Sequence, residues 1–210
     1  MVEVKKMPYR EKYANVIGNM KMYETFIPPF LQKHLGNEAV VQLQNIWQEG
    51  LKQITEDASD EDKYETAYAN WIWMAKSNLD FIHKQLGEEE NKQFELVEIE
   101  AFLKSKNSGL ALFLLKLIRA ISPDTAFTMT NKKMAYELQW ITPFSVSEMT
   151  RDRAIFDIPQ CKILDFPDVN GICTIGCQSI YPRWMAEQLM VDMKFNRQGN
   201  SCTATVTPLR

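Results

Sequence analysis

The sequence predicts an α+β protein in which a helical N-terminal half is followed by a mainly antiparallel sheet with helices on one face. Apolar residues recur with a 3.6-residue period through most of residues 8–86, which is typical of amphipathic helices. Beyond residue 92 the chain turns to short runs rich in β-branched and aromatic residues. The last two runs flank Gly199 and Asn200, a pair typical of a hairpin turn. Helices followed by the order β-α-β-β-α-β-β indicate the α+β class.

The first helix is expected over residues 9–27. Pro28 and Pro29 then interrupt the pattern, because proline lacks the amide hydrogen that an interior helical position needs. Pro29 is expected to open a short helix that ends at Gly36.

Two more helices complete the helical region. Asn37 is the expected N-cap of one of them. Ser59 is the expected N-cap of the other, since acidic residues crowd the turn after it, and Gly87 is its expected end. The helix that follows Ser59 is dense in aromatic side chains, which would line a ligand pocket or pack in a core, and helical spacing favours packing. These residues are Tyr64, Tyr68, Trp71, Trp73 and Phe81.

The rest of the chain is predicted to mix strands and helices. Residues 94–102 alternate like a strand, and residues 125–130 have strand-like composition. A buried amphipathic helix is expected at 109–121, and another helix at 177–190 with Pro182 in its first turn. The remaining strands are expected to pair as two hairpins, 134–142 with 153–164 and 193–198 with 201–206.

The polar stretch 87–92 marks the expected boundary between the two regions. We assign a helical region to residues 1–90 and an α+β, cysteine-containing region to residues 91–210. Whether the two regions form one compact domain is left open.

Charge and hydropathy narrow the expected partners. The net charge is −3 and no block of lysine or arginine stands out, so nucleic acid is not an expected partner. The N-terminus lacks the apolar run of a secretory signal, and residues 109–121 are too short for a membrane span. We therefore expect a cytoplasmic protein that binds a small molecule and no membrane, with its oligomeric state open. Cysteines in that compartment stay reduced, so they should be free, metal-bound or catalytic.

All four cysteines fall between residues 161 and 202, which indicates a site there. A metal centre formed by Cys161, Cys173, Cys177 and Cys202 is one interpretation. Cys173 and Cys177 have the loose spacing of a zinc knuckle, and four thiolates can hold zinc or an iron–sulfur cluster. In this alternative the chain is a non-catalytic protein or sensor that binds a metal or a small ligand.

A nucleophilic cysteine is the other interpretation. Cys177 is expected just ahead of a helix, where backbone N–H groups favour a thiolate, and Gly176 would let a substrate approach closely. The competing explanation is that Cys177 is a small buried apolar residue. Cys202 shares one face of its predicted strand with Ala204 and Val206, which also allows a purely structural role.

Residues 135–206 carry a family pattern: a hairpin that ends in a cysteine (AYELQWITPFSVSEMTRDRAIFDIPQCKIL), a cysteine-led helix (CQSIYPRWMAEQL) and a strand pair with a late cysteine (MKFNRQGNSCTATV). The pattern resembles the C-terminal half of the L-2-amino-thiazoline-4-carboxylate hydrolase family. The resemblance implies a hydrolase that opens small cyclic amidines, acts on a carbon–nitrogen bond other than a peptide bond and requires no cofactor. A similar ending occurs in 4-vinyl-reductase-type domains, which bind small hydrophobic ligands.

By position, Cys161, Cys177 and Cys202 match the family's recurrent cysteines, so the resemblance implies a cysteine-lined catalytic pocket. Arginine binds carboxylates bidentately, which makes Arg183 and Arg197 candidates to hold a substrate carboxylate. The candidate substrate-binding set is completed by two aromatic residues near Arg183, which are Tyr181 and Trp184.

Overall fold

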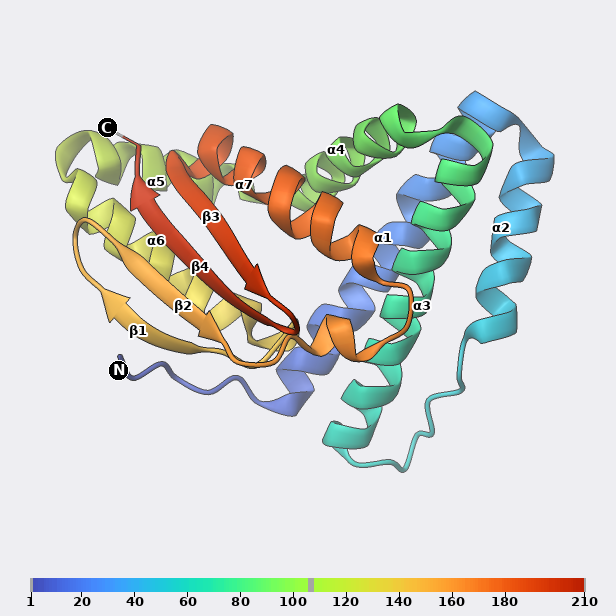
Figure 1. Cartoon of the computed structure of the whole chain (residues 1–210), viewed down its shortest axis with the longest axis horizontal. Coiled ribbons are helices and arrows are strands. Elements are labelled where there is room, and N and C mark those ends of the chain that lie inside the picture. Colours follow the sequence, from blue (N-terminus) through green and yellow to red (C-terminus); the bar gives the residue numbers. More distant parts are fainter. Residues whose placement is uncertain (1, 106–107, 210) are drawn as a thin grey trace. The chain divides into compact units, whose positions relative to one another are not determined.

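The computed structural model describes residues 2–105 and 108–209 and divides the chain into two compact units. One unit, the helical unit, is Pro8–Ser105; the other, the sheet unit, joins residues 1–7 to residues 106–210. Most of the helices precede a four-stranded antiparallel sheet (Figure 1). The predicted α+β class is therefore confirmed.

Four helices make up the helical unit. They are α1 (Tyr9–Leu35), α2 (Asn37–Gly50), α3 (Asp60–Leu86) and α4 (Glu88–Ser105). Helices α1 and α3, each of 27 residues, pack together and bury Ile27, Leu31 and Tyr68 completely or nearly so. Inside this core the Trp47 Nε1 on α2 donates a hydrogen bond of 2.8 Å to the Asn78 Oδ1 on α3.

The predicted ends of α3 are confirmed. The Ser59 hydroxyl accepts a hydrogen bond from the backbone N–H of Asp62, which satisfies one of the amides that a helix leaves unpaired at its start. Gly87 ends the helix with a φ of 91°, a left-handed conformation that glycine adopts without strain.

Two predictions in the helical region are wrong. Helix α1 continues through Pro28 and Pro29, because Ile27 and Leu31 on either side are fully buried and their packing outweighs the lost amide bonds. Residues 94–102 belong to α4 and are not a strand. A short alternating run also fits a helix, and here Phe94 is buried against Phe30 of α1, with ring centroids 5.0 Å apart.

The sheet unit holds the remaining helices and all four strands of the described chain. The helices are α5 (Ser108–Ile121), α6 (Pro123–Glu137) and α7 (Tyr181–Trp184), and the strands are β1 (Ser145–Met149), β2 (Ala154–Ile158), β3 (Val191–Gln198) and β4 (Ser201–Pro208). The strands run in the order β1-β2-β4-β3. Val2 forms an antiparallel bridge with Val146 of β1, so the N-terminal segment belongs to this unit. The helix predicted at 109–121 is confirmed as α5, but it is not a buried helix, since Phe113, Leu117 and Ile121 are exposed.

One face of the sheet is buried under helices. Phe156, Ala204 and Val206 point to that face and pack with Phe127 and Met134 of α6. Met185 joins the same core from a helical segment that runs from residue 170 to residue 189. In that segment α7 lies between two π-helical stretches, Ile172–Ile180 and Met185–Leu189.

The final predicted hairpin is confirmed as β3 and β4, and Gly199 in its turn has a φ of 61°. The first hairpin was predicted in the wrong place. Residues 125–130 and most of 134–142 are helical, because Phe127, Thr130, Asn131 and Met134 recur at helical spacing and are all buried. Strand β1 lies in the stretch that was expected to connect the two strands, and only 154–158 of the predicted 153–164 form β2.

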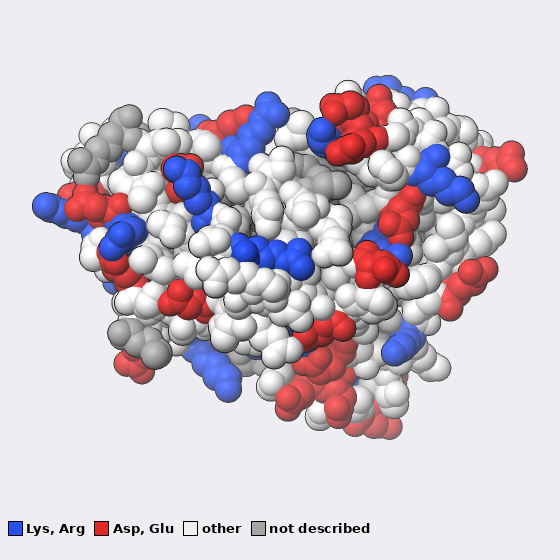
Figure 2. Space-filling view, viewed as in Figure 1, with Lys and Arg blue, Asp and Glu red and all other residues white. Residues whose placement is uncertain are grey.

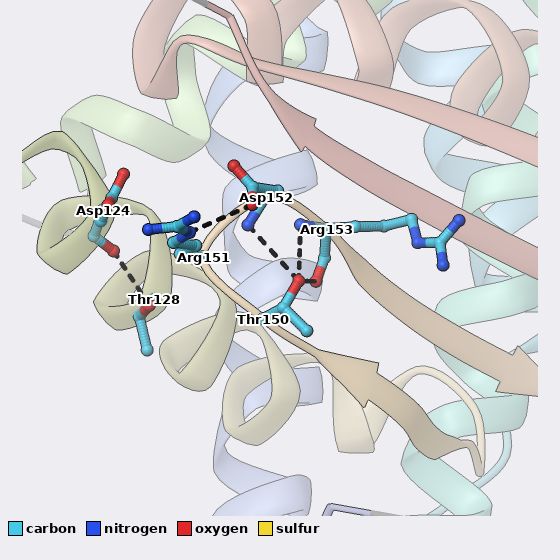
Figure 3. A network of polar contacts seen from close by, with 6 residues as sticks. All are labelled: Asp124, Thr128, Thr150, Arg151, Asp152 and Arg153. Carbon is cyan, nitrogen blue, oxygen red and sulfur yellow. Dashed lines mark hydrogen bonds and ion pairs between the residues drawn. The ribbon is translucent and has the colours of Figure 1, made fainter.

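A threonine closes the turn between β1 and β2. The Thr150 hydroxyl accepts hydrogen bonds from the backbone N–H of Arg153 at 3.1 Å and of Asp152 at 3.4 Å (Figure 3). Beyond the turn, the Arg153 guanidinium makes two hydrogen bonds to the Glu148 carboxylate, across the strand pair. This pairing lowers the pKa of Glu148.

Candidate functional site

Cys161 and Cys173 are both neighbours of Cys202, which lies next to the turn of the β3–β4 hairpin. Cys202 on β4 lies opposite Arg197 on β3 and opposite Ile158 on β2. Residues directly opposite one another in antiparallel strands share a face, so the thiol and the guanidinium lie on the same side of the sheet. Cys161, just after β2, donates its backbone N–H to the Asn200 carbonyl in the turn at 2.8 Å.

Arg197 ties the helical segment 170–189 to this turn. Its two terminal nitrogens lie 3.3 and 3.4 Å from the Asn170 Oδ1. Asn170 precedes Cys173 by three residues, about one helical turn, so this contact brings Cys173 toward Cys202. We call the group of Cys161, Cys173, Cys202 and Arg197 the thiol corner.

The charge state of Cys202 reflects this environment. Burial raises the pKa of the Cys202 thiol, and the neighbouring Cys173 and Cys161 raise it further. The Arg197 cation acts in the opposite direction and lowers this pKa, but it does not outweigh the other causes. Cys202 is therefore held as a neutral thiol at neutral pH.

The π-helical geometry determines which residue lies beside Cys173. In a π-helix the backbone hydrogen bonds join residues five apart, and Gln178 follows Cys173 by five. The Gln178 amide lies 3.8 Å from the Cys173 sulfur and donates to it. Irregular π turns of this kind are found frequently at functional sites.

Cys177 does not occupy the position predicted for it. The helical segment begins at residue 170, so Cys177 lies inside it rather than ahead of its first turn. The N-terminal backbone amides that were expected to favour a Cys177 thiolate are therefore distant in the helix. The Cys177 thiol instead neighbours Tyr181, whose pKa is raised first by burial and then by Cys177 and Glu137.

The predicted substrate-binding residues separate into three environments. Arg197 is part of the thiol corner, whereas Arg183 is exposed and pairs with Glu187 at 3.0 Å on its own helix. Tyr181 and Trp184 pack against the core of the sheet unit, with ring centroids 5.7 Å apart. The Trp184 Nε1 is buried without a hydrogen-bond partner among the described residues.

Pro182 lies in the middle of the helical segment rather than in its first turn. The aromatic residues of α3 follow the packing alternative at four positions, since Tyr64, Tyr68, Trp71 and Phe81 are all buried. Trp73 and Phe81 line a shallow hollow between α2 and α3, and a second hollow lies over the outer side of α6. Neither of these two hollows is lined by a cysteine.

The four cysteines are not arranged as the set of metal ligands that the metal interpretation requires. All four cysteines lie in the described part of the chain and are thiols, outside any disulfide. Within residues 2–105 and 108–209, no three cysteine, histidine, aspartate or glutamate side chains are arranged so that they could hold a metal ion.

Sequence reasoning missed Asn170 and Gln178. Both are polar residues in a stretch expected to be a loop and the start of a helix, and no local pattern distinguishes them. Their contacts with Arg197 and Cys173 depend on where the helical segment starts and on its π register.

Two comparisons with known proteins give no match for this chain. No family model matches the chain, and no curated protein matches its sequence. In the part of the chain that the structure describes, none of the helices has the length and apolar character needed to span a membrane. Basic side chains on the face shown in Figure 2 are interspersed with acidic ones.

Proposed function

We propose that the chain is a thiol-dependent hydrolase that opens small cyclic amidines bearing a carboxylate, and that the thiol corner is its site. The observation that carries this proposal is that Cys161, Cys173 and Arg197 all lie close enough to Cys202 to shift the pKa of its thiol. Thiol groups provide the nucleophile or contact the substrate, and a guanidinium provides a carboxylate anchor. The resemblance of residues 135–206 to amidine-opening hydrolases supports the same substrate class.

The arrangement suggests a division of roles. Arg197 is the carboxylate-binding group in this proposal, because its cation acts on Cys202 and no carboxylate pairs with it in the contacts given above, whereas Arg183 is paired with Glu187. Cys173 is the reacting thiol in this proposal, since the Gln178 amide donates to its sulfur and holds it in place beside Cys202. Cys202, whose pKa is raised, stays protonated and is suited to donate a hydrogen bond to the substrate.

Turnover of 2-amino-thiazoline-4-carboxylate by the purified protein tests the proposal. The product, N-carbamoyl cysteine, contains one more water than the substrate and is measured by mass spectrometry. We expect Cys173→Ser to lower kcat by more than about a hundredfold and Arg197→Gln mainly to raise KM. Lys194→Gln is the matched control for charge on β3, because Lys194 pairs with Asp192 at 3.0 Å.

Cys177→Ser distinguishes the two cysteines of the helical segment. If Cys177→Ser abolishes turnover while Cys173→Ser retains it, the assignment of the reacting thiol to Cys173 is wrong. If the unmodified protein turns over no cyclic amidine, the hydrolase proposal fails.

A non-catalytic small-ligand site is the second candidate. The raised pKa of Cys202 favours it, because a thiol held neutral is a poor nucleophile. Saturable binding of a small carboxylate without turnover, weakened by Arg197→Gln, is the result expected for this candidate.

A further inference from the structure

The side chain of Cys202 lies on the face of the sheet that the helices cover. Side chains alternate along a strand, so Cys202 shares its face with Ala204 and Val206. Both of these residues belong to the core that α6 and Met185 of the helical segment complete. The Cys202 thiol therefore lies at the hairpin end of this covered face, on the same side of the sheet as the helical segment.

Cys173 belongs to the part of the helical segment that packs on β3. The π-helical stretch Ile172–Ile180 contacts β3, which is the neighbour of β4 in the sheet. The Arg197 guanidinium, which shares the face of Cys202, also donates to Asn170, about one helical turn before Cys173. Two separate contacts therefore hold Cys173 beside the end of β4 that carries Cys202.

Both thiols are open to a small oxidant, and they differ in how firmly they are held. Cys173 and Cys202 are each partly exposed, and neither is in a disulfide. Cys202 is fixed, because β4 pairs with β2 on one side and with β3 on the other. Cys173 lies in the first turns of the helical segment, which the Asn170 side chain joins to Arg197. A disulfide needs Cβ atoms about 3.5–4.5 Å apart, so these turns are the part that adjusts when the bond forms.

We propose that Cys173 and Cys202 form a reversible disulfide when the protein meets hydrogen peroxide. The Cys173 sulfur attacks the peroxide and its O–O bond breaks, which leaves a sulfenic acid on Cys173 and releases one water. The Cys202 sulfur then attacks the Cys173 sulfur, an S–S bond replaces the S–O bond, and the hydroxyl group leaves with the Cys202 proton as a second water. The two thiols have together given up two hydrogen atoms with their electrons, and a dithiol reductant returns them.

The order of the two steps follows from the state of Cys202. Its raised pKa keeps it protonated, and a protonated thiol is a poor nucleophile, so Cys173 takes the first step. Cys177 neighbours Tyr181 instead. Cys161 is the competing partner, since its backbone N–H is bonded to the hairpin turn, but Cys173 has the larger influence on the Cys202 thiol.

Peptide mapping of the full chain after treatment with hydrogen peroxide tests the proposal. Once the remaining thiols are blocked, trypsin releases residues 154–162 with Cys161, residues 163–183 with Cys173 and Cys177, and residues 198–210 with Cys202. We expect a cross-link between 163–183 and 198–210 within a single chain, which dithiothreitol removes. Cys173→Ser and Cys202→Ser should each lower its yield by about tenfold or more. Cys177→Ser is the matched control, because Cys177 is on the same tryptic peptide, and it should leave the yield unchanged.

Dimedone, which labels sulfenic acids, tests the order of the steps. In Cys202→Ser the sulfenic acid on Cys173 has no partner thiol, so the label should accumulate on residues 163–183.

A cross-link between 154–162 and 198–210 would overturn the proposal and assign Cys161 as the partner of Cys202. Loss of the cross-link in Cys177→Ser but not in Cys173→Ser would also overturn it, as would oxidation of the unmodified protein without any cross-link. All of these readouts are peptide masses and need no turnover, so failure of the disulfide is distinguishable from failure of the proposed hydrolase activity.

Discussion

Cys202 is a thiol whose reactivity depends on its neighbours. Burial and two nearby cysteines raise its pKa, and Arg197 lowers it. The Arg197 guanidinium also donates hydrogen bonds to Asn170 of the helical segment. One side chain therefore both lowers the pKa of Cys202 and fixes the start of the helical segment beside the hairpin. Changing Arg197 should therefore be visible in the protonation of Cys202.

Alkylation of Cys202 by iodoacetamide measures this effect. Only the thiolate reacts, so the reaction should set in at higher pH than for an ordinary cysteine. In Arg197→Gln the midpoint should move to still higher pH, because the cation that favours the thiolate is lost. The modified peptide is quantified by mass spectrometry, with Lys194→Gln as the charge control on the same strand. A midpoint that moves to lower pH in Arg197→Gln contradicts this account of Cys202.

Part of the thiol corner could be predicted from the sequence. The Gly199–Asn200 turn specifies the β3–β4 register, and this register places Cys202 opposite Arg197. The position of Cys173 could not be predicted, because it depends on a helical segment that starts seven residues earlier than Cys177 and winds with π geometry. Local sequence patterns do not encode such a register.

At the scale of elements, capping signals were more informative than composition. Helix α3 has the predicted N-cap Ser59 and the predicted end Gly87, because each is a local interaction between a side chain or a conformation and the backbone. Residues 94–102 and 125–130 were assigned to strands from their residue types, and tertiary packing made them helical. The predicted fold class is nevertheless correct, because the hydrophobic periodicity of the helical first half and the turn residues of the final hairpin are strong signals.

The N-cap of α3 is a direct test of this local control. Ser59→Ala should lower the free energy of unfolding by about 1 kcal/mol, since the Asp62 amide loses its partner. Ser59→Asp should retain most of the stability, because aspartate is an equally good cap. Urea unfolding followed by tryptophan fluorescence measures both variants. Equal losses in the two variants would show that the cap bond is not the cause.

At the scale of the whole molecule, the helical unit is inserted into the sequence of the sheet unit. Residues 1–7 belong to the sheet unit, where the Met7 N–H donates to the Gln139 Oε1 and the Gln139 Nε2 donates to the Lys5 carbonyl. The helical unit, Pro8–Ser105, lies between these residues and the rest of the sheet unit. Each unit has its own core, so a substitution should act mainly on the unit that contains it.

Two single substitutions test this separation. Asn78→Ala leaves the buried Trp47 Nε1 without its acceptor and should destabilise the helical unit by about 1–3 kcal/mol. Gln139→Ala should release residues 1–7 and accelerate amide exchange in the sheet unit. Hydrogen exchange resolved by peptide is the measurement. If both variants accelerate exchange equally in both units, the chain unfolds as one cooperative body.

The N-terminal segment also has a consequence for the order of events during synthesis. Met7 leaves the ribosome early, yet its partner Gln139 is 132 positions further along the chain. At a rate of about 5–20 residues per second, about 7–26 seconds pass before Gln139 is made, and the helical unit is synthesised and can fold in that time. Residues 2–7 can therefore join the sheet unit only after the whole helical unit, which follows them in the chain, has been synthesised.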